Sequence, residues 1–359
     1  MRKVLIVGAG VAGSTLAWWL GRAGDEVTVV DHAAGLRSSG SPVDVRGPAI
    51  AVVERMGVRE QVRAAATVVT EMALVDAGGR ELGRMPVQAR DGMELARGDL
   101  ARILAEAAAG HAMIRHGDTV TALADDGHGV DVTFETGSAD RFDLVVGADG
   151  LHSRVRRLAF GPENRFTRHL GMFVATVALD TTPSDVRTVW MHNLPGQALA
   201  IHPTTGREGA ALMFRGRPEP GVRPVELLER EYARMGWRAP EVLTRVRSGD
   251  VVWFDSVIRV RLPRWARGRT VLVGDAASAV TLFGEGSSLA ISGAATLAEA
   301  LGAASVPDAL GIYEHAHRRR TAPRQRGVAA VSHLLVPATR TGIVLRDLGL
   351  RCLPARSRQ

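Results

Sequence analysis

Residues 3–31, KVLIVGAGVAGSTLAWWLGRAGDEVTVVD, decide the fold of this chain. The apolar run at 3–7 predicts a buried strand, 11–23 predicts a helix, and 26–30 predicts a second apolar strand. A strand, a crossover helix and a second strand in this order form a βαβ unit. The chain therefore begins with the first unit of a nucleotide-binding sheet.

The turn between the first strand and the helix reads GAGVAG over residues 8–13. Gly8 allows a tight turn, Gly10 lets backbone amides approach a pyrophosphate, and Gly13 lets helix and strand pack closely. Asp31 ends the second strand, where a carboxylate can accept hydrogen bonds from both ribose hydroxyls and would repel a 2′-phosphate. The pattern predicts a site for FAD or NAD rather than NADP.

A second motif, GADG at residues 147–150, follows an apolar strand at 144–146. Taken alone it has two interpretations. It can belong to a nucleotide site, or it can be only a strand-to-helix turn, for which Asp and Gly are ordinary choices.

A third motif begins with the strand at 270–273, which ends in Gly274 and Asp275, and continues with GEGSS at 284–288. A strand end places a carboxylate beside a bound polyol or phosphate, and a helix start can stabilise the negative charge of a reduced flavin near N1 and O2. The alternative is a hinge before a core helix. Three motifs in this order favour a flavin site.

The rest of the pattern completes an α/β chain. Between about residues 165 and 261, short segments of alternating polarity predict an antiparallel sheet inserted into the first domain. Further helices are predicted at 48–56, 58–66, 99–109, 285–303 and 307–335, and further strands at 68–75, 80–84, 119–124 and 130–135.

With GAGVAG, GADGLHSRVR and VLVGDAAS followed by GEGSS, the chain resembles the para-hydroxybenzoate hydroxylase-like, or group A, flavoprotein monooxygenases over about residues 3–330. The resemblance is to the short form without a thioredoxin-like C-terminal domain. It implies an α/β fold: a Rossmann-like FAD-binding domain of the GR2 type, an inserted antiparallel β-sheet substrate domain, and C-terminal helices. We expect the FAD-binding domain at 1–164 and 263–335, the substrate sheet at 165–262, and a tail or helix at 336–359.

The resemblance also implies residue roles. Asp275 would contact the ribityl and pyrophosphate region, and Arg97 would contact the cofactor from the start of a helix. Arg46 falls beside the expected isoalloxazine ring and is the candidate catalytic residue. The implied FAD-binding residues are Gly8, Gly10, Val11, Ala12, Gly13, Asp31, Arg97, Asp149, Gly150, Gly274, Asp275, Gly286, Ser287 and Ser288.

The substrate pocket is less defined by the pattern. Met213 and Phe283 are its candidate lining residues, although Met213 can equally be core. Ser278 stands where many members of the family have His, and Leu282 stands where most have Pro, so the surroundings of the flavin ring and substrate depart from the family pattern.

By the resemblance, NADH or NADPH reduces FAD, and the reduced flavin and O2 give a C4a-hydroperoxide that oxygenates a hydrophobic aromatic or polyketide-like molecule of secondary metabolism. Two other functions keep the same motifs. One is a flavin-dependent reductase, dehydrogenase or cyclase that inserts no oxygen. The other is a non-catalytic protein that uses the fold to bind a ligand.

Composition excludes several other classes. Hydrophobic residues make up 46% and charged residues 23%, which predicts a folded chain. The net charge is +7, with arginines spread among acids and no basic stripe for nucleic acid. The single cysteine, Cys352, favours a reducing, cytoplasmic setting, and no apolar run is long enough for a membrane span. No metal motif appears: His315 and His317 are expected at the surface of a helix. We expect a monomer or homodimer.

Overall fold

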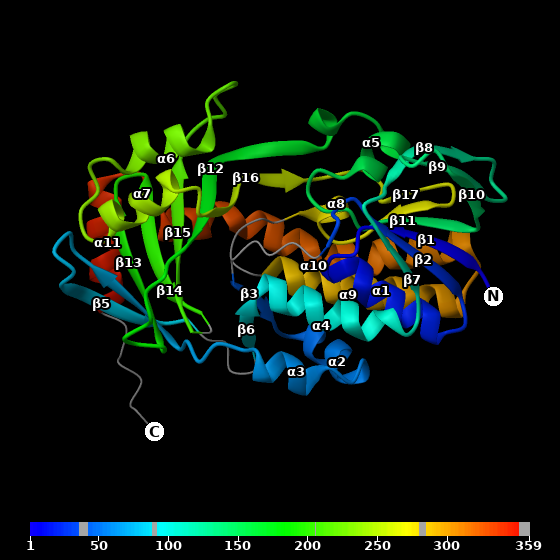
Figure 1. Ribbon diagram of the computed structural model, residues 1–359, viewed down its shortest axis with the longest axis horizontal. Coiled ribbons are helices and arrows are strands. Elements are labelled where there is room, and N and C mark those ends of the chain that lie inside the picture. Colours follow the sequence, from blue (N-terminus) through cyan, green and yellow to red (C-terminus); the bar gives the residue numbers. More distant parts are fainter. Residues whose placement is uncertain (36–41, 88–91, 205, 280–284, 352–359) are drawn as a thin grey trace.

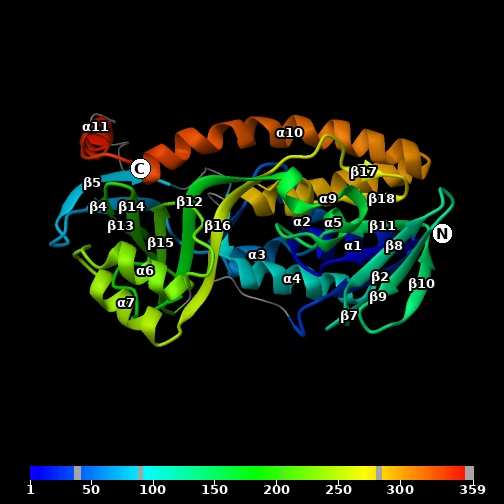
Figure 2. The same cartoon turned by 90° about the horizontal axis from the view of Figure 1, so that it is seen from above.

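The computed structural model describes residues 1–35, 42–87, 92–204, 206–279 and 285–351. The molecule has two halves, each built around its own sheet (Figure 1). A view from above shows one long helix, α10, running along both halves (Figure 2). Its bounds are Val306–Leu335.

The first half contains a six-stranded sheet in the order β17-β18-β11-β1-β2-β7. All neighbours are parallel except β17 and β18. Since β11 and β2 flank β1 on opposite sides, the chain reverses direction across the sheet at β1, where such folds bind ligands. The strands are β1 Lys3–Val7, β2 Glu26–Asp31, β7 Met113–His116, β11 Leu144–Gly147, β17 Ala266–Arg267 and β18 Thr270–Leu272.

Helices cover this sheet, and α9 packs against both α1 and α10. The apolar residues of β1, of α1 and of α9 belong to one hydrophobic core. The helices of this half are α1 Val11–Arg22, α2 Pro48–Arg55, α3 Arg59–Ala64, α4 Arg97–Ala109, α5 Arg154–Phe160, α8 Asp275–Ser278 and α9 Glu285–Ala303, with the short 3₁₀ helix η1 Glu163–Arg165.

Two small sheets complete this half. An antiparallel sheet joins β8 Val120–Asp125, β9 Val130–Phe134 and β10 Ala139–Phe142. A two-stranded ribbon joins β3 Pro42–Val45 and β6 Met93–Ala96, and it lies between the two halves (Figure 1).

The second half contains a seven-stranded sheet in the order β16-β12-β15-β14-β13-β4-β5. The expected antiparallel pairing runs from β16 to β13, but β13 pairs in parallel with β4. Since β4 and β5 come from residues 71–86, a boundary at residue 164 does not separate the two sheets. The strands are β4 Glu71–Val75, β5 Glu81–Pro86, β12 Thr167–Ala178, β13 Thr188–Leu194, β14 Gln197–Pro203, β15 Glu208–Arg215 and β16 Val251–Val260.

The two faces of this sheet have different partners. One face packs against α6 Pro224–Tyr232 and α7 Ala239–Arg247. The other face includes Met213 and packs with Val328 of α10 and with Val336 just after it. The last helix, α11 Arg340–Arg351, lies beside β5 and β13. Helix α10 therefore contributes to the cores of both halves.

His317 is buried, with 1% of its surface exposed, so its predicted surface position is wrong. His317 and Tyr313 are four residues apart and therefore lie on the same, buried face of α10. The His317 ring stacks on the Tyr313 ring, with centroids 5.9 Å apart, and also lies near the Trp265 ring. A Cβ at Gly293 of α9 would lie 2.7 Å from His317 Nε2, so the two helices are in close contact there. His315, two residues earlier, is exposed as expected.

Candidate functional site

The turn between β1 and α1 requires glycine at two positions. A Cβ at Gly13 would lie 1.8 Å from the Gly8 carbonyl oxygen, and a Cβ at Gly8 would lie 2.4 Å from the Ala148 carbonyl oxygen. A Cβ at Gly10, by contrast, would meet no atom within 4 Å. The start of α1 thus faces open space, and its first turn has no side-chain cap. Free backbone N–H groups with a positive helix end facing such a space suit a phosphate.

Asp31 is fixed at the end of β2, on the same edge of the sheet. Its Oδ2 accepts a hydrogen bond from the Ala9 amide at 2.7 Å, and its Oδ1 accepts one from the Ala33 amide at 2.8 Å. Each carboxylate oxygen retains further acceptor capacity. The acid is thereby held next to the glycine turn.

The Asp149 side chain is occupied by its own turn. It accepts hydrogen bonds from the Ser153 hydroxyl, from the Arg154 amide at 2.6 Å and from the Val155 amide at 2.9 Å. Burial raises the pKa of Asp149, while these three bonds act in the opposite direction. The carboxylate therefore organises the start of α5, and in this motif only Gly150 presents backbone with no atom within 4 Å of a Cβ.

The third motif, from a distant part of the sequence, lies beside the first turn of α1. A Cβ at Gly274 would lie 3.0 Å from the Ala12 Cβ, so the turn after β18 sits on the first turn of α1. Arg156, which is fully buried, donates to the Ala276 carbonyl oxygen at 3.0 Å and to the Leu151 carbonyl oxygen at 2.6 Å. The second and third motifs are thus hydrogen-bonded to each other.

The Asp275 carboxylate has no hydrogen-bond donor among the described residues. Burial raises the pKa of Asp275, and the charge of Arg97 at the start of α4 lowers it. A carboxylate that is shielded from water and lacks a donor is costly unless a ligand supplies one. The Asp275 carboxylate is therefore able to accept a hydrogen bond from a ligand hydroxyl.

The start of α9 is tied to β3. Ser287 and Ser288 both donate their hydroxyls to the Asp44 carbonyl oxygen, at 2.6 and 2.7 Å, and the Arg46 amide donates to Ser288 Oγ at 3.0 Å. Gly286 lies in the same first helical turn. These bonds explain why hydroxyl residues stand at this helix start, and they bring residues 44–46 to the N-terminus of α9.

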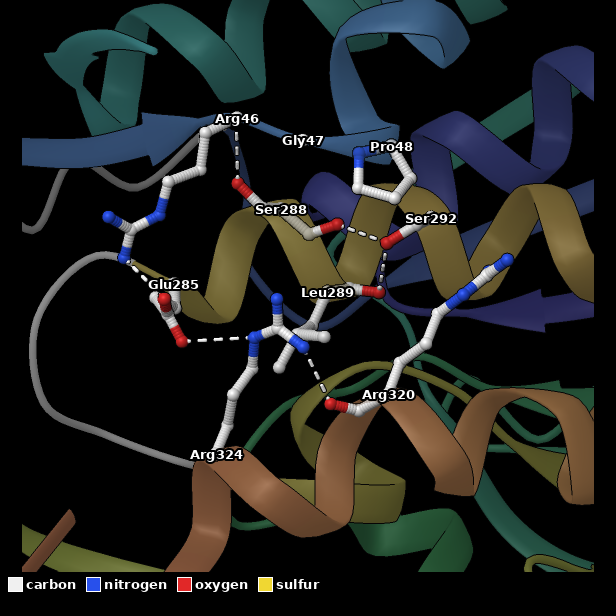
Figure 3. Close-up of a pocket in the computed structure, with 9 residues that line it drawn as sticks. All are labelled: Arg46, Gly47, Pro48, Glu285, Ser288, Leu289, Ser292, Arg320 and Arg324. Carbon is white, nitrogen blue, oxygen red and sulfur yellow. Dashed lines mark hydrogen bonds and ion pairs between the residues drawn. The ribbon is translucent and has the colours of Figure 1, made fainter. Parts of the chain in front are cut away.

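A pocket of about 250 Å³ opens beside this junction (Figure 3). Glu285 lies between two arginines: its Oε1 is 2.6 Å from Arg46 Nη2 and its Oε2 is 3.1 Å from Arg324 Nε. Ser288, Leu289 and Ser292 form the α9 wall, and Arg320 and Arg324 of α10 form the opposite wall. Arg46, expected beside the flavin ring, therefore lines a pocket.

One predicted pocket residue, Met213, lies away from this pocket. Met213 is 8% exposed and belongs to the apolar cluster between the seven-stranded sheet and α10, so among the described residues its contacts are those of a core residue. Phe283 and Leu282 lie outside the described residues.

Three polar residues at the junction were missed from the sequence: Asp44, Glu94 and His202. They lie on β3, β6 and β14, and the His202 Nε2 atom is 2.6 Å from Glu94 Oε1. In the sequence, Asp44 and Glu94 are recognisable only as acids that alternate with apolar residues in a short strand. This pattern is too common to identify a site.

Two further findings concern the described part of the chain. No group of three or more His, Cys, Asp or Glu side chains there could hold a metal ion. No single helix within the described ranges is long and apolar enough to cross a membrane.

Comparison with known proteins adds the family. The model of a family described as "FAD binding domain" matches residues 1–325. The uncharacterized protein MT1298 of Mycobacterium tuberculosis (strain CDC 1551 / Oshkosh) is 38% identical over 330 residues, which cover 87% of this chain and 88% of that protein. A flavin-dependent monooxygenase of Legionella longbeachae is 29% identical, covering 82% of this chain and 79% of that protein.

A solved structure has the same fold. The crystal structure of the tetracycline destructase Tet(51) superposes with a TM-score of 0.83 at 27% sequence identity, covering 98% of this chain and 95% of that chain.

Proposed function

The chain belongs to the FAD binding domain family of flavin-dependent monooxygenases, and we propose that it uses NADH or NADPH and O2 to hydroxylate a small hydrophobic aromatic or polyketide-like molecule. The observation that carries the proposal is the convergence of three glycine turns from distant parts of the chain. Gly8 contacts Ala148, and Gly274 contacts Ala12, around the open space in front of Gly10.

The residues present fit FAD. Open space at Gly10 and the free start of α1 would admit the pyrophosphate, and Asp31 would accept the ribose hydroxyls. Asp275, whose carboxylate has no donor among the described residues, would accept ribityl hydroxyls, with Arg97 balancing its charge. Gly150 would contribute backbone at the same edge.

The other end of FAD would lie at the start of α9. The N–H groups of a helix's first turn carry partial positive charge, which stabilises negative charge on a ring placed before them. Ser287 and Ser288 hold this helix start against the carbonyl of Asp44 and so fix where the ring would lie. FAD would supply the redox chemistry: it accepts a hydride from NAD(P)H and activates O2.

The protein's own contribution is position, charge and exclusion of water. The Arg46–Glu285–Arg324 ion pairs border an opening of about 250 Å³ next to the proposed ring position. The apolar sheet face and α10 would shield the substrate from solvent. We assign no proton transfer to Arg46, whose role here is electrostatic.

The proposal is tested by loading the purified protein with FAD and measuring three quantities. These are the visible flavin spectrum, NADH and NADPH oxidation with a panel of phenolic aromatics, and incorporation of ¹⁸O from ¹⁸O₂ into product. We expect a bound flavin spectrum and a labelled product. Nicotinamide oxidation without labelled product from any panel member would favour a reductase or dehydrogenase, and a protein that takes up no FAD would refute the proposal altogether.

A further inference from the structure

The ribbon of β3 and β6 lies at the boundary between the two halves (Figure 1). Side chains alternate along a strand, so Val43, Val45 and Leu95 enter the core while the intervening residues point the other way. Asp44 and Glu94 are direct cross-strand partners on that second face. Two acids stand side by side there, a pairing that is unfavourable unless something compensates it.

His202 of β14 compensates one of the two acids. Its Nδ1 lies 2.8 Å from the Pro203 carbonyl oxygen, which can only accept, so Nδ1 carries a proton. Its Nε2 lies 2.6 Å from Glu94 Oε1. Although burial raises it, the hydrogen bond and charge of His202 hold the pKa of Glu94 below its usual value. Glu94 is therefore ionised and paired.

Asp44 has no such partner. Its carboxylate has no hydrogen-bond donor among the described residues, and the nearest cation, Arg46 Nη2, is 3.5 Å away and closer to Glu285. Burial, with the charges of Glu94 and Glu285, raises the pKa of Asp44 to about 6, while Arg46 and His202 act in the opposite direction. A shielded carboxylate without a donor gains most from a donor brought by a ligand.

We propose that Asp44 is the acceptor for a hydroxyl group on the substrate, a phenol or an enol, and thereby orients the ring for oxygen transfer. The inference rests on the proposed function, since it concerns the substrate of that reaction. Arg46 lines the pocket and contacts both Asp44 and the pocket residue Glu285, so one side chain joins Asp44 to the wall of this opening. Asp44 lies between the two halves. A substrate bound by the seven-stranded sheet would there be next to the half that contains the nucleotide site.

The charges of the cluster select a neutral donor. Asp44, Glu94 and Glu285 lie among the cations Arg46 and Arg324, and Arg320 lines the same pocket, so acids and cations alternate around the opening. A substrate carboxylate would meet three acids, and an ammonium group would meet three cations. A hydroxyl satisfies Asp44 without adding charge, and its hydrogen bond to a carboxylate pushes electron density onto the ring that receives oxygen.

The test compares two probes that differ only in the donor, 2-naphthol and its methyl ether, by equilibrium dialysis against the FAD-loaded protein. We expect the wild type to bind 2-naphthol about tenfold more tightly than the ether, the magnitude of one hydrogen bond to a charged acceptor. Asp44→Ala should bind both probes equally. Exposed Glu106→Gln on α4 serves as the control and should keep the preference.

A pH series separates hydrogen bonding by Asp44 from a structural role. Phenols have pKa values of about 10, so the probe stays neutral between about pH 5 and about pH 7.5. The preference for 2-naphthol should be present above about pH 6 and lost below it, as Asp44 becomes protonated. Asp44→Asn should abolish this dependence. His202→Gln, which leaves Glu94 unpaired, should move the midpoint up, and Glu285→Gln should move it down.

Equal binding of both probes to the wild type, no saturable binding of either, or an unchanged preference in Asp44→Ala overturns the proposal. FAD content, measured for every variant, shows whether the site itself is intact. Because dialysis requires no turnover, a protein that fails to oxygenate any aromatic refutes the proposed function without altering this comparison.

Discussion

The Arg156 guanidinium donates a hydrogen bond to the Ala276 carbonyl oxygen across 3.0 Å. The two residues belong to different motifs, one following β11 and the other following β18, and the guanidinium is fully buried. The bond therefore fixes the turn after β11 relative to the turn after β18, which are two of the three turns of the FAD site.

Arg156→Met should lower the free energy of unfolding by about 3 kcal/mol, because the buried carbonyl oxygens of Ala276 and Leu151 lose their donor. Urea unfolding monitored by circular dichroism measures the change. The neighbouring exposed Arg157→Met is the matched control and should change stability by less than about 0.5 kcal/mol. Equal effects of the two substitutions would show that the buried bond is unimportant.

Gly10→Val and Gly13→Ala should fail in different ways. A Cβ at Gly10 meets open space, so the valine variant should fold with a near-normal melting temperature and yet lose FAD, because its side chain occupies the phosphate position. A Cβ at Gly13 would lie 1.8 Å from the Gly8 carbonyl oxygen, so the alanine variant should be destabilised even without FAD. Thermal unfolding of the apoprotein and flavin content after reconstitution distinguish the two. A valine variant that retains FAD contradicts the assignment.

Asp275→Asn should make the apoprotein more stable while weakening FAD binding. Burial raises the pKa of Asp275, so the ionised carboxylate opposes folding at neutral pH, and a neutral amide removes that cost. Because the amide is a weaker acceptor for ribityl hydroxyls, the dissociation constant of FAD should rise about tenfold or more. Fluorescence titration and thermal unfolding give the two values. Unchanged FAD affinity would remove Asp275 from the binding site.

His317 should make the folded state sensitive to acid. Burial, with the charges of Arg320 and Arg324, lowers the pKa of His317 from its ordinary value of 6.5 to about 4. The neutral ring stabilises the fold above about pH 6.5, and this contribution is lost as the pH falls from about 6.5 to about 4, because the unfolded chain takes up the proton first.

The full effect is about 3 kcal/mol. It is measured as the difference in unfolding free energy between the wild type and His317→Gln at a series of pH values. The difference should be constant above about pH 6.5 and change below it; a parallel pH dependence in the two proteins would refute the buried, neutral state of His317.

The βαβ start, the sheet-forming motifs and the long helices were predictable because each is local. The period of apolar residues in β1, α1 and β2 and the glycine spacing at 8–13 are set by the steric needs of a single unit. The resemblance, and with it FAD and the monooxygenase family, is confirmed by the family match and the relatives.

The polar junction was not predictable, because its residues meet only through tertiary pairing. β3 and β6 are four residues each, too short for a reliable period, and their partner His202 comes from a strand of the other half. His317 was misplaced for a related reason: the sequence of α10 does not say which face a second helix will cover. The pairing of β4 with β13 joins segments more than 100 residues apart, and nothing local specifies it.

The order in which the sheet strands occur along the chain has a consequence for biosynthesis. β18, next to β11 in the sheet, and α9, which packs on α1, are translated after the whole seven-stranded sheet. A nascent chain that ends before residue 275 lacks Asp275 and the helix start at Ser287, so it has only part of the FAD-binding surface. The surface proposed for the cofactor is therefore complete only when the chain has been synthesised past the start of α9.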